Sequence, residues 1–345
     1  MTHPTLTNLD NPVLRAGLQS LLDDKTKPLG SLGRLEQLAV QIGLILQTTR
    51  PVLQQPQMLV CAGDHGLAKL GVSAYPQDVT WQMVENFLAG GAAVNVLARQ
   101  HGIALTVADC GVAHDFAPRE QLRLCKVAPG TADSTQGPAM TPEQCQQAMA
   151  NGRALVQSLP GNVLMLGEMG IGNTSAAALL LARLGGHDIA LCTGAGTGLD
   201  DAGIQRKTAI LARALAANPQ ATQPLDALAA LGGLEIATMV GAFLQAALEN
   251  RVILVDGFIV CSALLVAARI EPLVLQRCVF AHQSDERGHA LMLQTLNAQP
   301  LLNLGLRLGE GSGAALAWPL LPAACAILNE MASFSQAGVD RQSDL

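Results

Sequence analysis

A glycine-rich stretch, residues 167–175, contains the side chains best suited to chemistry. It follows the apolar run 163–166 and leads into the alanine- and leucine-rich run 176–181, which is typical of a strand that enters a helix through a tight turn. Glycines let the backbone approach a ligand, and the first N–H groups of a helix favour an anion. A turn without a ligand would explain the glycines equally well. The carboxylate of Glu168 therefore decides the interpretation: a ribose-phosphate site in which Glu168 faces the sugar or the base.

A second isolated carboxylate, Glu310, stands between Gly309 and Gly311 after an apolar run. Apolar neighbours raise the pKa of a carboxyl group toward neutrality, which suits a general base, and the flanking glycines leave the backbone free to turn. The alternative is a structural glutamate that closes a loop by capping a helix. The local pattern alone favours this alternative, so both roles stay open at this point.

Another glycine-rich segment, residues 194–198, resembles a phosphate nest, and Lys207 follows about two turns into the next helix. Lys207 could bind phosphate, or it could pair with Asp200 or Asp201 on the surface. The segment does not match the GxGxxG pattern, and no acidic residue ends a second strand at the usual distance. NAD binding is therefore only weakly indicated.

The histidines do not predict a metal centre. His65 follows Asp64, and His282 and His289 lie seven residues apart, but neither arrangement matches a common metal-ligand motif. Structural histidines with satisfied hydrogen bonds are the favoured interpretation. Since no GxSxG motif is present, a serine hydrolase is not supported either.

Residues 71–77 form a predicted loop that contains Ser73 and Tyr75, the only tyrosine of the chain. An ordinary surface loop is the simplest interpretation of these residues and of Gln82, which follows them. A single tyrosine in such a loop is also consistent with contact to a ligand.

Composition limits the class of protein. Half of the 345 residues are hydrophobic, 14% are charged and 3% are aromatic, which predicts an extensive core and argues against binding of nucleic acid by base stacking. The net charge of −6 provides no basic surface for DNA, RNA or an anionic membrane.

Eight scattered cysteines without a CxxC pair indicate buried free thiols in a reducing compartment. The first residues lack the pattern of a signal peptide, and Asp256 makes a strand, a turn and a helix more plausible for 252–270 than a membrane span. We expect a soluble, cytoplasmic protein.

Apolar runs alternate with helix-forming segments along the chain, which predicts a mainly parallel sheet with helices on both faces. The expected strands are 58–62, 103–110, 163–166 and 252–255. Residues 113–140 are polar and are predicted to form an exposed connection. Ligands bind at the carboxyl ends of parallel strands, so polar clusters at strand ends predict one composite site. These clusters are 64–66, 167–175, 194–201, 256 and 309–312.

Several helix starts carry capping signals. Ser31 is predicted to cap the second helix of the chain, and Asn173 or Thr174 the helix after the first glycine-rich stretch. Thr141 and Gln144, with proline between them, are predicted to form a capping box.

Taken together, the motifs resemble the nicotinate-nucleotide–dimethylbenzimidazole phosphoribosyltransferase family, whose members activate the lower ligand of cobalamin. The resemblance covers nearly the whole chain, and its specificity comes from many short motifs in one order. These motifs are residues 27–36, 63–66, 75–83, 86–93, 167–174, 196–201, 256–258, 282–284 and 308–311. Ser175 and Ser312 stand where threonine is expected, and Ala195 where many relatives carry a larger residue.

The resemblance implies transfer of phosphoribose from nicotinate mononucleotide to 5,6-dimethylbenzimidazole, giving α-ribazole 5′-phosphate and nicotinate. The reaction would be a single displacement with inversion and would need neither cofactor nor metal. Glu310 would be the general base, and Glu168 would stabilise positive charge on the sugar. The remaining implied substrate-binding residues are Gly170, Gly172, Asn173, Thr174, Gly196, Gly198, Lys207, Ser73, Tyr75, Gln82, Met83 and Asp256.

The resemblance also implies an organisation. A large Rossmann-like α/β domain would span residues 51–319, with helices on both faces of a parallel sheet. A small helical domain would combine residues 1–50 with about 320–345, and the protein would be a homodimer.

Two other functions are kept as alternatives. A phosphoribosyltransferase that uses the pyrophosphate donor would require Mg²⁺ and adjacent acidic residues, whereas Glu168 stands alone. A non-catalytic nucleotide-binding sensor would not depend on Glu310.

Overall fold

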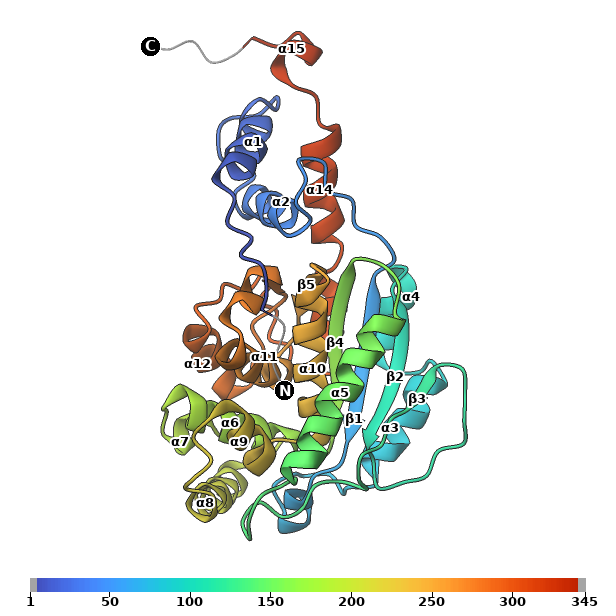
Figure 1. Cartoon of the computed structure of the whole chain (residues 1–345), viewed down its shortest axis with the longest axis vertical. Coiled ribbons are helices and arrows are strands. Elements are labelled where there is room, and N and C mark those ends of the chain that lie inside the picture. Colours follow the sequence, from blue (N-terminus) through green and yellow to red (C-terminus); the bar gives the residue numbers. More distant parts are fainter. Residues whose placement is uncertain (1–4, 341–345) are drawn as a thin grey trace.

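Six parallel strands form one sheet at the centre of the computed structural model, which describes residues 5–340 (Figure 1). The strands are β1 (Gln57–Gly63), β2 (Ala104–Gly111), β3 (Leu122–Leu124), β4 (Val163–Met169), β5 (Val252–Val255) and β6 (Cys278–Phe280). Their order is β3-β2-β1-β4-β5-β6, and every neighbouring pair is parallel. This is the doubly wound order: β2 and β3 are added on one side of β1, and β4, β5 and β6 are added on its other side, so the strand order reverses between β1 and β4. The predicted Rossmann-like α/β fold is confirmed.

Helices cover both faces of the sheet, because alternate residues of the central strands point to opposite sides. Leu59 and Leu166 belong to one apolar cluster, and Met58 and Met165 to the other. The first face is covered by α10 (Leu234–Leu248) and α11 (Phe258–Ile270), against which α5 (Pro142–Ser158), α6 (Asn173–Gly185) and α9 (Pro224–Leu231) pack. The second face is covered by α3 (Val79–Leu88), α4 (Ala93–Gln100) and α13 (Ser312–Ala317).

A separate group of helices lies at the amino ends of the strands (Figure 1). It consists of α1 (Pro12–Asp23), α2 (Arg34–Ile45) and α14 (Leu320–Glu330). Asn329 of α14 donates to the carbonyl of Pro51 ahead of β1, and Gln41 of α2 donates to the carbonyl of Cys278 at the start of β6. The buried side chains of this group continue into the apolar cluster of the sheet. The division into domains 1–50 with 320–345 and 51–319 stays a prediction, and residues 1–4 and 341–345 lie outside the described part.

Six further elements complete the described part of the chain. They are η1 (Gly66–Leu70), α7 (Ile189–Cys192), α8 (Asp201–Ala217), η2 (Pro272–Arg277), α12 (Arg287–Thr295) and α15 (Phe334–Ala337).

The structure corrects several local predictions. The second helix begins at Arg34 with Gly33 as its N-cap, so Ser31 does not cap it; residues 31–33 form turns instead. The predicted exposed connection 113–140 contains β3, a short edge strand that extends the sheet beside β2. The capping box of Thr141 is confirmed, with both of its hydrogen bonds to Gln144 present.

Residues 252–270 form β5 and α11, which confirms the predicted strand, turn and helix. Within the described residues, only the stretch Ser312–Glu330 is long and apolar enough to cross a membrane by length and composition, and 56% of it is buried inside the protein, as in a core helix. All eight cysteines are free, and seven of them are buried, which confirms the prediction of buried thiols except for the half-buried Cys125.

Candidate active site

A cavity of about 500 Å³ opens at the carboxyl ends of β4 and β5. Four carboxylates line it: Glu168 at the end of β4, Asp256 after β5, Glu286 after β6, and Glu310 ahead of α13. Four of the predicted polar clusters contribute to its wall, since residues of the 167–175, 194–201, 256 and 309–312 segments all face the cavity. The fifth cluster, residues 64–66, does not line it.

The turn after β4 determines where Glu168 lies. β4 runs through Met169, so Glu168 is a strand residue rather than part of a loop. Gly170 begins the turn, and a Cβ atom there would overlap the carbonyl oxygen of Gly63. Gly172 is the N-cap of α6 with φ of 96°, so neither Asn173 nor Thr174 caps that helix. Only glycine adopts this left-handed conformation without strain, which explains why the cap is not a polar side chain.

Glu168 is buried and held by two donors. Its carboxylate accepts hydrogen bonds from the side-chain amide of Asn173 and, at 3.3 Å, from the backbone N–H of Glu310. Burial, followed by the negative charges of Asp256 and Glu235, raises the pKa of Glu168 to about 8, although both hydrogen bonds act in the opposite direction. The free protein therefore keeps much of this carboxyl group protonated at neutral pH.

Glu310 occupies a strained backbone position. It has φ of 66° between Gly309 and Gly311, both of which are also left-handed. Its carbonyl oxygen lies against Gly167 of β4, where a Cβ atom would overlap it. A non-glycine residue in this region costs about 1–3 kcal/mol and is retained where the surroundings impose it, often at functional sites.

The carboxylate of Glu310 combines features of both predicted roles. Burial raises its pKa to about 7, a backbone hydrogen bond from Val94 in the first turn of α4 opposes this shift, and the charge of Asp256 adds to it. The Val94 contact is what the helix-capping alternative predicts. The Oε2 atom of Glu310, however, is buried without a hydrogen-bond partner among the described residues, and the side chain lines the cavity. A carboxylate with one free oxygen and a pKa near neutrality suits proton abstraction.

Asp256, the third of these carboxylates to have close contacts, is also buried. Its Oδ1 accepts a hydrogen bond of 2.8 Å from the N–H of Ala314 in α13 and lies 3.5 Å from Nε2 of His282. His282 lines the cavity together with Ser284 and Glu286, and sequence reasoning assigned none of these three to the site. The available signal was their position: they follow β6, at the same edge of the sheet as the other clusters.

The predicted phosphate region is organised around a buried lysine. Lys207 Nζ donates to Thr174 Oγ1 at 2.9 Å and to the carbonyl of Gly194 at 3.4 Å. Burial lowers the pKa of Lys207 to about 8, against the opposing charge of Glu286. Lys207 is therefore not a surface partner of Asp200, which instead caps α8. It lies behind the cavity wall, directly under Thr174.

The other predicted site residues divide into two groups. Those that line the cavity are Tyr75, Gly170, Asn173, Thr174 and Gly196. Those that do not line it are Ser73, Gln82, Met83, Gly172, Gly198 and Lys207. Ser73 nevertheless lies next to the site, because its Oγ is 3.0 Å from Oγ1 of Thr197, a cavity residue. The roles assigned to all of these residues stay predictions.

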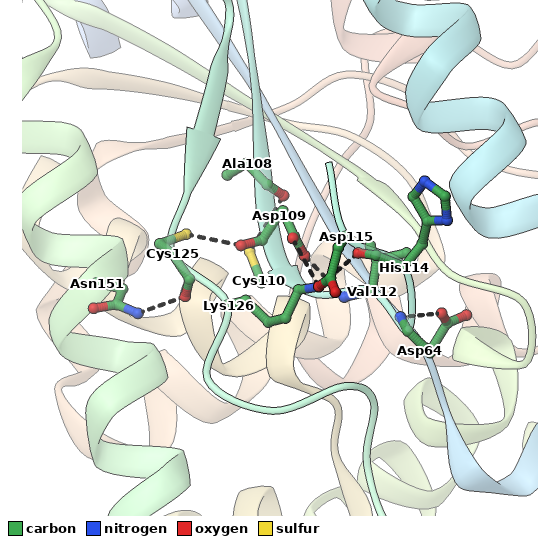
Figure 2. Close-up of polar contacts among 11 residues, drawn as sticks. Asp64, Ala108, Asp109, Cys110, Val112, His114, Asp115, Cys125, Lys126 and Asn151 are labelled. Atoms are coloured by element: carbon green, nitrogen blue, oxygen red, sulfur yellow. Dashed lines mark hydrogen bonds and ion pairs between the residues drawn. The ribbon is translucent and has the colours of Figure 1, made fainter. Parts of the chain in front are cut away.

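A further polar cluster lies outside the cavity, at the carboxyl end of β2 (Figure 2). Lys126 Nζ donates to the carbonyl of His114 at 2.6 Å and to Oδ1 of Asp115 at 3.1 Å, and it lies 3.6 Å from Oδ2 of Asp109. These contacts fix the loop that follows β2. Within residues 5–340, no group of three or more His, Cys, Asp or Glu side chains is arranged to hold a metal ion.

Comparison with known proteins gives one consistent match. A family model described as a phosphoribosyltransferase, DBI_PRT, matches residues 8–339. A relative from Variovorax paradoxus (strain S110), named nicotinate-nucleotide–dimethylbenzimidazole phosphoribosyltransferase, is 66% identical over 341 residues, covering 99% of this chain and 98% of the relative. A protein of the same name from Cupriavidus necator is 59% identical and covers 99% and 100% of the two chains. The crystal structure of CobT from Thermus thermophilus has a TM-score of 0.92 at 41% identity, covering 96% of this chain and 100% of that one.

Proposed function

Because the chain belongs to the nicotinate-nucleotide–dimethylbenzimidazole phosphoribosyltransferase family, we propose that it transfers phosphoribose from nicotinate mononucleotide to 5,6-dimethylbenzimidazole. The products are α-ribazole 5′-phosphate and nicotinate. The observation that carries the proposal is Glu310, a carboxylate with a free oxygen and a pKa of about 7 beside a second carboxylate in one cavity.

One base is enough for this reaction. The pyridinium ring of the donor leaves as a neutral ring, so no general acid is needed. When one ring nitrogen of the benzimidazole attacks the ribose carbon, the other ring N–H becomes acidic, and Glu310 accepts that proton. Attack from the face opposite the leaving group converts a β-linked donor into an α-linked product.

Glu168 has a complementary role. Its pKa of about 8 means that the empty site carries little charge there at neutral pH. The positively charged pyridinium ring of a bound donor favours the ionised form of a nearby carboxyl group, so Glu168 would release its proton when nicotinate mononucleotide binds. The resulting carboxylate would stabilise the positive charge that develops on the sugar. Thr174 and Gly196 would contact the phosphate, with Lys207 supplying charge from behind Thr174.

The test is to incubate the purified protein with nicotinate mononucleotide and dimethylbenzimidazole in the presence of a metal chelator. Chromatography should detect nicotinate and α-ribazole phosphate in equal amounts, and NMR should assign the α anomer. Nucleotide binding without product would favour a sensor, and a strict requirement for Mg²⁺ and the pyrophosphate donor would favour the other phosphoribosyltransferase class.

Family membership also supports the proposed homodimer with a small helical domain. Sedimentation analysis should give a species of roughly twice the 35.8 kDa mass of the chain. A species of single mass at micromolar concentration would contradict the dimer.

A further inference from the structure

A buried ion pair lies directly under the turn that follows β4. His65 Nε2 and Glu235 Oε1 are 2.7 Å apart, and both side chains are almost completely inaccessible to solvent. His65 follows the end of β1, and Glu235 is the second residue of α10, 170 positions later. Neither residue lines the cavity, so neither would touch a bound substrate.

Glycine backbones close around this pair on several sides. A Cβ atom on Gly233 would overlap the imidazole ring of His65, and one on Gly63 would lie 2.9 Å from Oε2 of Glu235. A Cβ atom on Gly170 would lie 3.4 Å from Nε2 of His65. The end of β1, the turn after β4 and the start of α10 therefore all pack against one pair of side chains.

The charge state of the pair is consistent with an ion pair. Burial by itself favours a neutral ring, but the carboxylates of Glu235 and Asp64 outweigh it and hold the pKa of His65 above its ordinary value. Asp64 is engaged elsewhere, because its Oδ2 accepts a hydrogen bond from the N–H of Ala113 (Figure 2). Glu235 is thus the hydrogen-bonded partner of His65.

The turn of residues 170–173, which packs against His65, also contacts Glu168. Its far side is held by Thr80 of α3, whose Oγ1 accepts a hydrogen bond from the N–H of Ile171. Its last residue, Asn173, donates to the carboxylate of Glu168. A shift of the turn would therefore move the donor that orients Glu168.

We propose that the His65–Glu235 pair is a positioning element: it holds the turn of residues 170–173 and, through Asn173, orients Glu168 in the cavity. The inference deepens the proposed function and rests on it for the kinetic part of its test. A second readout, amide hydrogen exchange of the turn, needs no substrate.

The experiment compares three variants with the wild-type protein. His65→Ala removes the pair and leaves a buried carboxylate without its partner, whereas Glu235→Gln keeps an oxygen that accepts from the ring. Arg251→Gln is the matched control, because it disrupts a buried cation at the other end of α10, bonded to the carbonyls of Val156 and Leu159. This variant shows what a loss of stability does to exchange and kcat when the His65–Glu235 pair is intact.

We expect His65→Ala to accelerate amide exchange in residues 166–176 and to lower kcat by at least about tenfold, with a smaller change in KM for the base. Glu235→Gln should keep exchange and kcat near the wild-type values, and Arg251→Gln should alter neither. If His65→Ala does not fold, the double variant His65→Leu/Glu235→Met replaces the pair with apolar side chains and carries the same expectation.

Wild-type exchange and kcat in a folded variant without the pair would overturn the inference. Absence of product with the wild-type protein would instead refute the proposed function, and the exchange measurement would still decide the positioning role.

Discussion

Replacement of Glu310 by glutamine should separate activity from stability. Glutamine keeps the length of the side chain and its capacity to accept a hydrogen bond from Val94, but it does not accept a proton at neutral pH. Loss of general-base catalysis should therefore lower kcat by about 10²–10⁴. KM for nicotinate mononucleotide should change much less, because the assigned role is in proton transfer rather than in binding.

The same substitution should lower activity but raise the free energy of unfolding at high pH. The pKa of Glu310 is about 7 in the folded protein and 4.5 ordinarily, so the folded state binds more protons than the unfolded state between these values. The contribution of Glu310 to the free energy of unfolding of the wild type therefore falls as pH rises through this window and is least favourable above pH 7. Since each pKa unit corresponds to about 1.4 kcal/mol, the full penalty is about 3 kcal/mol, and glutamine removes it.

Urea denaturation at pH 5 and pH 8.5 measures this difference. Glu310→Gln should be more stable than the wild type at pH 8.5, and most of the gain should disappear at pH 5. Glu120→Gln, a change of an exposed glutamate, is the control and should show no such dependence. Equal stability of the Glu310 variant and the wild type at both pH values would refute the argument that burial raises this pKa. Near-normal turnover would refute its role as the base.

Three further changes test the surroundings of the base. Asp256→Asn removes a charge that raises the pKa of Glu168 and of Glu310, so the acidic limb of the kcat/KM profile should move to lower pH; an unchanged profile would contradict this. Lys207→Met should raise KM for nicotinate mononucleotide by at least about tenfold while leaving KM for the base nearly unchanged, as measured by initial rates; equal effects on both would argue against a phosphate role. Gly167→Ala should displace the loop that carries Glu310, lowering both the urea midpoint and kcat. Gly17→Ala in α1, whose new Cβ atom would lie an ordinary 3.8 Å from Cγ2 of Thr49, should lower neither.

Much of the fold could be predicted because the spacing of hydrophobic residues and the residue types found in turns are properties of short, continuous stretches of sequence. The apolar run 163–166 and the glycines after it were enough to identify β4 and its helix. Helix caps were less predictable: Ser31 is a suitable cap by type, but the chain turns at Gly33 before the helix starts. The edge strand β3 was missed because its three residues lie in a polar connection and are defined by pairing with β2 rather than by their own pattern.

The properties of the site depend on contacts that no local pattern contains. The sequence indicated two glutamates beside glycines, but their raised pKa values depend on burial and on the charges of Asp256 and Glu235, which lie on other segments of the chain. It also favoured a satisfied structural histidine at position 65, and the structure supplies the partner, Glu235. His65 is structural in that it forms a hydrogen bond with Glu235, but it also packs against the turn whose Asn173 contacts Glu168. A residue with a purely structural hydrogen bond can therefore still affect activity when it packs against a segment that positions a reacting group. In this fold, the segments that position the cavity residues follow the ends of several different strands.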